Sequence, residues 1–350
     1  MIAAKHKIRV LIVDDSALVR KILCVGLSKD PDIEVIGQAS DPYRARDLLV
    51  ELEPDVVTLD VEMPRMDGVT FLRRFMPVMP VPTVVISSLT QKGRQITLDA
   101  LEAGAVDVIA KPMAGVADGL PIMLDDICRR VKSAAAVNMA GFVRTDTTPT
   151  EEVTAALGET TDRVIAIGAS TGGVQALSRI LPAFPPDAPG IVIVQHMPTG
   201  FTSTFAERLN SCCRMRVSEA EDGSRVLPGS ILLAPGGTRH MSLTRYGGEY
   251  RVTLKEGPPV NYSRPAVDVL FHSVAREAKG NAAAAVLTGM GKDGASGLLA
   301  IRQAGGHTFA QDEASCVVFG MPQAARELGA AERMLPLEKI PTQLVGALHR

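Results

Sequence analysis

Short apolar runs alternate with amphipathic segments along most of the chain. The segments SALVRKILCVGLSKD (16–30) and DPYRARDLLVELEP (41–54) have the spacing of apolar residues that is typical of a helix with one buried face. Strands that alternate with such helices predict a parallel sheet with helices on both faces. In the first half, the runs rich in β-branched residues are 8–13, 33–37, 55–59, 83–87 and 105–109, and a helix around 118–132 closes the unit.

The alternation stops at residues 131–161, a small, polar and locally acidic stretch with only a weak helical pattern at 150–157. Segments of this composition commonly join domains. We therefore expect a first domain at residues 5–130, an interdomain linker at 131–161 and a second domain at 162–350.

The second half returns to the alternating pattern, which again predicts an α/β domain with a mainly parallel sheet. The glycine pair at 247–248 indicates a hairpin and hence an antiparallel portion. The expected strands are 163–167, 191–195, 230–234, 250–254 and 283–287, and the expected helices are 173–181, 200–210, 265–279 and 294–304.

Composition and charge exclude several classes of protein. The 350 residues are 46% hydrophobic and 22% charged with a formal net charge of −2, which is typical of a soluble globular protein and disfavours a nucleic-acid-binding domain. The five cysteines are odd in number and form no C-x-x-C pair, as expected of thiols in a reducing compartment. Neither a signal-peptide core nor an apolar run long enough to span a membrane is present, so we expect a cytoplasmic protein without membrane insertion.

Polar side chains lie at the ends of four expected strands in the first half. Asp14 and Asp15 follow the first strand, Asp60 follows the third, Ser87 ends the fourth and Lys111 follows the fifth. The carboxyl ends of parallel strands lie side by side and form the natural ligand crevice of such a sheet. Taken singly, the acids could be helix caps, but three crowded carboxylates require a cation, and Mg²⁺ is the simplest choice.

These residues lie in four motifs that closely resemble response-regulator receiver domains, which have a five-stranded, doubly wound, flavodoxin-like fold: VDDS (13–16), LDVEMPRMDG (59–68), SSLT (87–90) and AKP (110–112). The resemblance implies that Asp60 accepts a phosphoryl group from a histidine kinase and that Ser87 and Lys111 bind the phosphoryl oxygens. The implied Mg²⁺ ligands are Asp15, Asp60 and the backbone carbonyl of Glu62, with Asp14 nearby.

The aromatic residue that many receivers have three positions before this lysine is replaced by Val108. We therefore expect the movement that accompanies activation to use other packing.

The stretch GASTGG (168–173) lies between an expected strand and an expected helix. By itself it fits a serine nucleophile on a sharp turn and a glycine-rich phosphate cradle equally well. A P-loop needs a lysine, and none occurs between Ser170 and Arg179; a dinucleotide fold needs an acid where the next strand ends in Gln195 and His196. His196 could take the proton of Ser170, and Asp293 in a later glycine-rich turn could orient the imidazole, although it could also cap a helix.

Five motifs of the second half resemble the catalytic domain of the chemotaxis protein-glutamate methylesterases, the CheB family: IGASTGG (167–173), QHMP (195–198), LAPGGTRHM (233–241), RPAVDVLF (264–271) and LTGMGKDG (287–294). The resemblance implies that Ser170 is the nucleophile, His196 the base and Asp293 the acid. The implied oxyanion contacts are Thr171 and, through its backbone N–H, Met290.

The implied reaction is hydrolysis of glutamate γ-methyl esters on methyl-accepting chemoreceptors to glutamate and methanol, with deamidation of glutamines, in sensory adaptation. This domain would need no cofactor, and phosphorylation of the receiver would activate it. Two alternatives remain at this point. The second half could be an output domain that binds nucleotide or DNA through an anion loop, or it could be an adaptor without catalytic activity.

Overall fold

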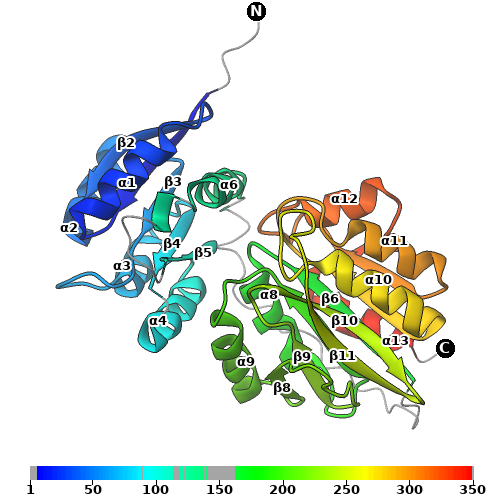
Figure 1. The fold of residues 1–350 in the computed structure, drawn as a ribbon. Helices are drawn as coiled ribbons and strands as arrows, with labels where there is room; N and C mark the ends of the chain where they lie inside the picture. The colour runs from blue at the N-terminus through cyan, green and yellow to red at the C-terminus, as the bar shows by residue number, and fades with distance from the viewer. Residues whose placement is uncertain are drawn as a thin grey trace, which may run out of the picture. The chain divides into compact units, whose positions relative to one another are not determined.

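The computed structural model describes residues 6–88, 90–112, 119–121, 123–137, 139 and 162–348 (Figure 1). The chain divides into two compact units, Met1–Arg144 and Thr145–Arg350. The weak helix expected at 150–157 and most of the expected linker lie outside the described residues. Within the described part, no helix combines the length and the apolar character that crossing a bilayer requires.

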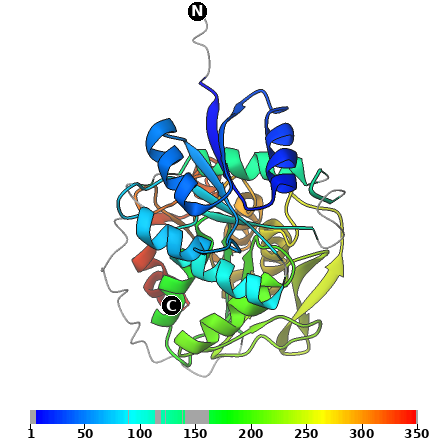
Figure 2. The ribbon, with the colours of Figure 1, turned by 90° about the vertical axis from the view of Figure 1, so that its left-hand side faces the viewer.

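The N-terminal unit contains a five-stranded sheet in which all neighbouring strands are parallel. The strand order is β2-β1-β3-β4-β5, so the predicted doubly wound fold is confirmed. Figure 2 shows this unit, coloured from blue to cyan, from a second direction. The strands are β1 (Ile8–Val13), β2 (Ile33–Ala39), β3 (Val56–Leu59), β4 (Thr83–Ser87) and β5 (Asp107–Ala110).

Among the described residues of this unit, five helices of eight or more residues cover the sheet. Helices α1 and α6 contact each other and bury apolar side chains against Val10 and Ile12 of strand β1. Four of the helices begin at a side chain that caps the first turn, namely Ser16, Asp41, Asp67 and Thr90. The helices are α1 (Ala17–Leu27), α2 (Pro42–Leu52), α3 (Gly68–Phe75), α4 (Gln91–Glu102) and α6 (Leu124–Ala135), so the last turn of α6 lies within the segment expected as linker.

The C-terminal unit contains a seven-stranded sheet of order β14-β13-β12-β6-β7-β9-β8, again with parallel neighbours throughout. The predicted mainly parallel α/β architecture is confirmed. The strands are β6 (Val164–Ala169), β7 (Gly190–Gln195), β8 (Arg216–Glu219), β9 (Ser230–Leu233), β12 (Ala282–Val286), β13 (His307–Gln311) and β14 (Arg333–Leu335).

An antiparallel hairpin forms a separate two-stranded sheet in this unit, as the glycine pair at 247–248 predicts. It consists of β10 (Arg239–Tyr246) and β11 (Glu249–Glu256). Its apolar face, including Met241 and Val252, shares a core with Phe271 of helix α10, and α10 also contacts β6 of the large sheet. Helix α10 therefore packs between the hairpin and the large sheet.

The helices of the C-terminal unit are α8 (Gly173–Ile180), α9 (Phe201–Cys212), α10 (Val267–Ala278), α11 (Ala295–Gln303), α12 (Met321–Glu327) and α13 (Ile340–Ala347). Residues 162–348 also contain three short 3-10 turns: Leu181–Ala183, Lys279–Asn281 and Leu337–Lys339. Helix α10 starts directly above Gly168 of β6. A Cβ atom at Gly168 would lie only 2.2 Å from Cγ1 of Val267, the first residue of α10. The glycine thus permits the close approach of this helix to the sheet.

We expect Gly168→Ala to lower the free energy of unfolding by about 1–3 kcal/mol, because the added methyl group must displace the N-terminus of α10. Urea unfolding followed by circular dichroism would measure the change. The matched double variant Gly168→Ala/Val267→Ala removes the colliding branch and should recover part of the loss. A fully stable Gly168→Ala variant, or a double variant less stable than the sum of the two single changes, would contradict this packing argument.

Candidate active site and phosphoryl-acceptor site

Ser170 and His196 follow neighbouring strands of the large sheet. Strands β6 and β7 are parallel, and their last residues, Ala169 and Gln195, lie opposite each other. The backbone N–H of His196 donates to the carbonyl of Ala169 over 3.1 Å, which keeps the two strand ends together. Asp293 comes from the loop after β12, the neighbour of β6 on its other side. The topology therefore brings three of the sequence-predicted site residues together at the carboxyl ends of adjacent strands.

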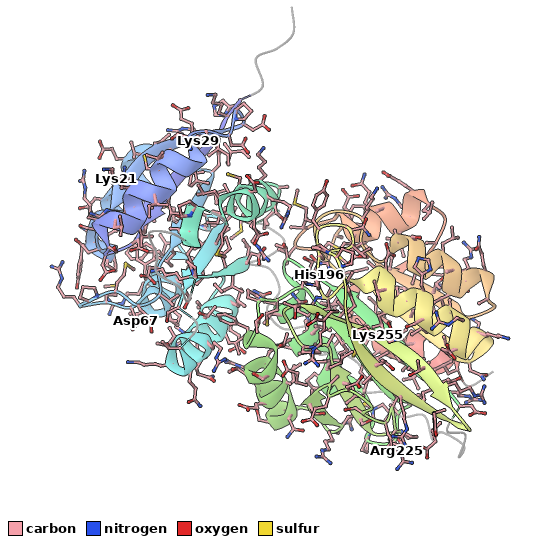
Figure 3. The ribbon with its side chains drawn as sticks, viewed as in Figure 1. Lys21, Lys29, Asp67, His196, Arg225 and Lys255 are labelled. Atoms are coloured by element: carbon pink, nitrogen blue, oxygen red, sulfur yellow. The ribbon has the colours of Figure 1, made fainter. Side chains whose placement is uncertain are left out.

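The predicted acid and base are in direct contact. His196 Nε2 lies 2.8 Å from Asp293 Oδ2, and the two side chains are 10% and 2% exposed. Figure 3 marks the position of His196 among the side chains of the C-terminal unit. The other ring nitrogen of His196, Nδ1, lies 3.3 Å from the hydroxyl of Ser263. Among the described residues, the Ser170 hydroxyl has no hydrogen bond to either His196 or Asp293, as is common for a nucleophile and its base before substrate binds.

Backbone donors hold the carboxylate of Asp293 at the N-terminus of α10. The N–H groups of Val267 and Asp268 donate to Oδ2 and Oδ1 over 2.7 and 3.0 Å. Burial by itself would raise the pKa of Asp293, but the contact with His196 and these N–H groups outweigh it and lower the pKa. An ionised carboxylate only accepts hydrogen bonds, so Nε2 of His196 donates to Asp293, and Nδ1 is the ring nitrogen left to accept a proton.

The turn that bears Ser170 is fixed by its backbone. The N–H of Ser170 donates to the carbonyl of Thr288 over 3.0 Å, and its carbonyl accepts from Gly173 N and Gln195 Nε2 over 2.7 and 2.9 Å. Gly172 adopts a left-handed conformation with φ of 77°, which glycine tolerates best. The amide of Gln195 also donates to the carbonyl of His196 over 3.3 Å, so one side chain joins the turns of Ser170 and His196.

The predicted oxyanion residues lie in segments that adjoin Ser170. Thr171 is the next residue in the turn and is buried, and its carbonyl accepts from the Thr288 hydroxyl over 3.0 Å. Met290 follows Gly289, where an added Cβ would lie 2.6 Å from Cβ of Ser170. The absence of a side chain at Gly289 therefore lets the loop before Asp293 approach Ser170 closely.

Sequence reasoning missed three polar residues of this site. Asn261 Nδ2 donates to Asp293 Oδ1 over 3.2 Å and to Asp268 Oδ2 over 2.8 Å, and Ser263 contacts His196. Burial, together with the charge of Asp293, raises the pKa of Asp268 despite a hydrogen bond from Gly297 N. Asp268 belongs to the motif RPAVDVLF, but no periodic pattern marks Asn261 or Ser263, which lie in a loop.

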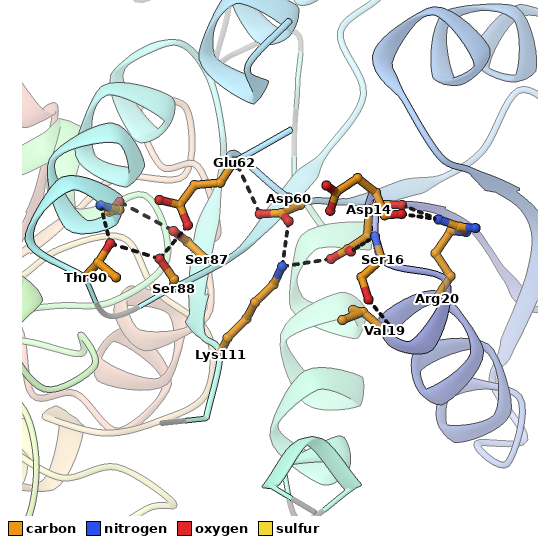
Figure 4. Close-up of polar contacts among 12 residues, drawn as sticks. Asp14, Ser16, Val19, Arg20, Asp60, Glu62, Ser87, Ser88, Thr90 and Lys111 are labelled. Atoms are coloured by element: carbon orange, nitrogen blue, oxygen red, sulfur yellow. Dashed lines mark hydrogen bonds and ion pairs between the residues drawn. The ribbon is translucent and has the colours of Figure 1, made fainter. Parts of the chain in front are cut away.

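In the N-terminal unit, Lys111 joins two of the predicted acids. Its ammonium Nζ lies 2.6 Å from Asp60 Oδ2 and 3.0 Å from Asp14 Oδ2 (Figure 4). Burial raises the pKa of Asp60, with the charge of Asp14 adding to it and Lys111 opposing it. Burial would lower the pKa of Lys111, but the two carboxylates outweigh it and raise that pKa. Asp60 therefore belongs to a buried cluster of interacting charges that Lys111 joins.

The acid cluster fits a divalent cation. Asp14, Asp15 and Asp60 each offer a carboxylate oxygen, and these atoms lie within 4.8 Å of one another. One lysine leaves three such carboxylates with excess negative charge, and hard oxygen ligands are those that Mg²⁺ prefers. The backbone N–H of Glu62 donates to Asp60 Oδ1 over 3.1 Å, while the Glu62 side chain accepts a hydrogen bond from Ser88 over 2.6 Å.

The other residues around this cluster are placed as follows. The buried Ser87 hydroxyl donates to the carbonyl of Gly93 in α4 over 3.4 Å, and so is directed at that helix in this structure. Val108 is buried in β5 opposite Val85 of β4. Arg20, which sequence reasoning missed, donates to the carbonyls of Asp14 and Asp15 over 2.7 and 3.0 Å and so fixes the backbone of the acid pair.

Comparison with known proteins gives consistent matches for both units. The family described as CheB methylesterase matches residues 165–344, and the response regulator receiver domain matches residues 10–117. A protein of Syntrophotalea carbinolica named protein-glutamate methylesterase/protein-glutamine glutaminase is 55% identical over 98% of both chains. A Cereibacter sphaeroides protein of the same name, numbered 2, is 57% identical over 98% of this chain and 93% of its own.

One solved structure also resembles the C-terminal unit. The CheB methylesterase catalytic domain of Thermotoga maritima is 43% identical, with a TM-score of 0.51, and the match covers 53% of this chain and 97% of that one.

The lowered pKa of Asp293 predicts a dependence of stability on pH. A carboxyl whose folded pKa lies below its ordinary value near 3.8 stabilises the fold above that value, and this contribution is lost as pH falls through the folded pKa. We expect Asp293→Asn to lower the free energy of unfolding by about 1–3 kcal/mol at pH 7, and the difference from wild type to shrink below about pH 4.

Urea unfolding at a series of pH values measures this difference, with Asp187→Asn, at an exposed position in the same unit, as the control. A gap between wild type and Asp293→Asn that stays constant from pH 7 to pH 3 would show that Asp293 is not held ionised in the fold.

Proposed function

The chain belongs to the CheB methylesterase family and carries a response regulator receiver domain, and from this premise we propose that it hydrolyses glutamate γ-methyl esters on chemoreceptors to glutamate and methanol. The observation that carries the proposal is the buried contact of His196 with Asp293 at the strand end next to Ser170. The family match and the 55% identity to a protein-glutamate methylesterase/protein-glutamine glutaminase support the substrate class.

In the first half of the reaction, Ser170 Oγ attacks the carbonyl carbon of the ester. His196 Nδ1 takes the hydroxyl proton, because Nε2 is already engaged with Asp293. The charge of Asp293 then stabilises the imidazolium, whose Nε2–H remains bonded to the carboxylate. The Ser263 hydroxyl, 3.3 Å from Nδ1, must turn its hydrogen away from the single lone pair of that nitrogen before Ser170 can donate its proton there.

Thr171 and the backbone N–H of Met290 would stabilise the negative charge that develops on the ester oxygen. Each such donor typically increases the rate about 10²–10³-fold. His196 returns the proton to the departing methoxide, so that methanol leaves and an acyl-serine remains. A water molecule, deprotonated by His196, then attacks the acyl carbon and releases glutamate and free Ser170. No step requires a metal in this unit.

The same acyl chemistry accounts for deamidation. A glutamine amide attacked by Ser170 gives the same acyl-serine, and His196 protonates the departing nitrogen so that ammonia leaves. Hydrolysis of the acyl-serine then gives glutamate. We therefore propose glutaminase activity at the same site, in keeping with the names of the relatives.

We further propose that the receiver unit controls this activity and thereby sensory adaptation. A histidine kinase would transfer its phosphoryl group to Asp60: the phosphorus–nitrogen bond breaks as a phosphorus–oxygen bond forms. Asp15, Asp60 and the Glu62 carbonyl, with Asp14 nearby, would hold Mg²⁺, which neutralises charge on the phosphoryl group when bound.

Ser87 and Lys111 would bind the phosphoryl oxygens. The phosphoryl group adds about one and a half to two negative charges, which would draw Lys111 away from its present contacts with Asp60 and Asp14. We propose that this change in a buried charge cluster raises the activity of the catalytic unit.

We expect Ser170→Ala to reduce methanol release from methylated receptor fragments by about 10⁴-fold or more, because the nucleophile is lost. Gas chromatography of released methanol measures the rate, and Ser211→Ala, an exposed serine of α9, serves as the control. A domain that binds anions through backbone N–H groups, or an adaptor, would show no methanol release in the wild type. Retention of wild-type rate by Ser170→Ala would refute the serine mechanism.

We expect Asp60→Asn to abolish the increase in methanol release that a small phosphodonor such as acetyl phosphate causes in the wild-type chain with Mg²⁺. The amide cannot form the acyl phosphate, while Ser170 and its partners are unchanged. Asp47→Asn, on the exposed part of α2, is the matched control and should respond like wild type. An Asp60→Asn variant that the phosphodonor still activates would rule out Asp60 as the acceptor.

A further inference from the structure

A tight turn with an unusual backbone lies beside the candidate catalytic residues. Val260 and Ser263 exchange two backbone hydrogen bonds, of 3.0 and 2.9 Å, and so close a two-residue loop. The two residues between them, Asn261 and Tyr262, have φ of 49° and 64°. Positive φ at both central positions is the geometry of a type I′ turn. We call residues 260–263 the type I′ turn.

The second central position of such a turn favours glycine, yet here it holds a tyrosine. Asparagine tolerates the left-handed region well, so Asn261 suits its place. Tyr262 does not, because its Cβ crowds the backbone there, and a strained bulky residue persists only where the surroundings fix it. Backbone strain of this kind is common at functional sites. A tyrosine at position 262 therefore indicates a functional role for this side chain.

The segment on both sides of the type I′ turn is held firmly. The ring of the buried His240 accepts from the N–H of Ala266 over 3.1 Å and donates to the carbonyl of Pro258 over 2.9 Å. The guanidinium of Arg264 donates to the carbonyls of Gly237 and Gly257 over 3.0 and 2.8 Å. The hairpin therefore anchors the segment before and after the turn, and this anchoring sustains the strained conformation.

Both neighbours of Tyr262 contact the candidate catalytic residues. Asn261 donates to Asp293, and the Ser263 hydroxyl lies 3.3 Å from His196 Nδ1, the nitrogen that would accept the proton of Ser170. Tyr262 lies between these two contacts and is 82% exposed. The turn thus holds a largely exposed aromatic residue next to Ser263, which contacts the candidate base.

We propose that Tyr262 is a substrate-contact residue that binds the receptor segment on either side of the modified glutamate. The proposal rests on the proposed function, and it concerns recognition of the protein chain, not of the ester group. An ester that reaches Ser170 as part of a receptor chain brings neighbouring side chains over the residues that surround the base. A tyrosine supplies a large contact area with a polar tip, and a fixed turn presents it at little cost in conformational entropy.

The test compares a protein substrate with a small one, using the full chain with a phosphodonor. Methanol release is measured on methylated receptor fragments and on a blocked glutamate γ-methyl ester, which is too small to extend beyond the site. Tyr262→Gly removes the ring and suits the positive φ, so the variant should unfold at a temperature equal to or above that of wild type. Its kcat/KM on receptor fragments should fall about tenfold through a higher KM, with no change on the small ester.

The control Tyr262→Phe keeps the ring and should retain most of the activity on receptor fragments. Wild-type rates of Tyr262→Gly on both substrates, or equal losses on both, would overturn the role of Tyr262; equal losses would mean that the turn only positions His196 and Asp293. Failure of the wild-type chain to release methanol from either substrate would instead refute the proposed function, and the proposal for Tyr262 with it.

Discussion

The arrangement of the C-terminal unit depends on the burial of one charge, the carboxylate of Asp293. A buried carboxylate is stable only if donors surround it, and here the donors come from separate parts of the chain: His196 after β7, the first N–H groups of α10, and Asn261 in the type I′ turn. The start of α10 can supply its N–H groups only because Gly168 lets that helix lie close to β6. The close packing of α10 on β6 therefore also determines the position of His196, the proposed base.

The N-terminal unit also contains buried carboxylates, but it compensates their charge by different means. Its acids also lie at the carboxyl ends of parallel strands, but a lysine side chain, not a set of backbone N–H groups, compensates Asp60 and Asp14. Against the effect of burial, the contact with His196 and the fixed N–H groups lower the pKa of Asp293, whereas burial and a neighbouring acid raise the pKa of Asp60. The first arrangement suits a permanent partner for a base, and the second suits a group whose charge changes.

Alternation of apolar runs and amphipathic segments was sufficient to predict the five-stranded sheet, four strands of the seven-stranded sheet (β6, β7, β9 and β12) and most helices, because strands buried on both faces need continuous apolar residues. The strands β8, β13 and β14 were not predicted, because they are short and partly polar, with sequences RVSE, HTFAQ and RML. Residues at strand ends could be predicted as site candidates because the topology brings those ends together. Asn261 and Ser263 could not, since the conformation of a turn with two positive φ angles leaves no periodic signal.

The orientation of the His196 ring is a further property that residue types leave open. Asp293 reaches Nε2 because its carboxylate is fixed at the start of α10, and this contact leaves Nδ1, the nitrogen nearer the backbone, as the base. Because Nδ1 lies close to the backbone, rotation of the His196 side chain moves this nitrogen little. The distance between Nδ1 and Ser170 therefore depends more on the backbone of the two strand ends than on side-chain rotation. Gln195, which donates to the carbonyls of both Ser170 and His196, is therefore the side chain best placed to hold that distance.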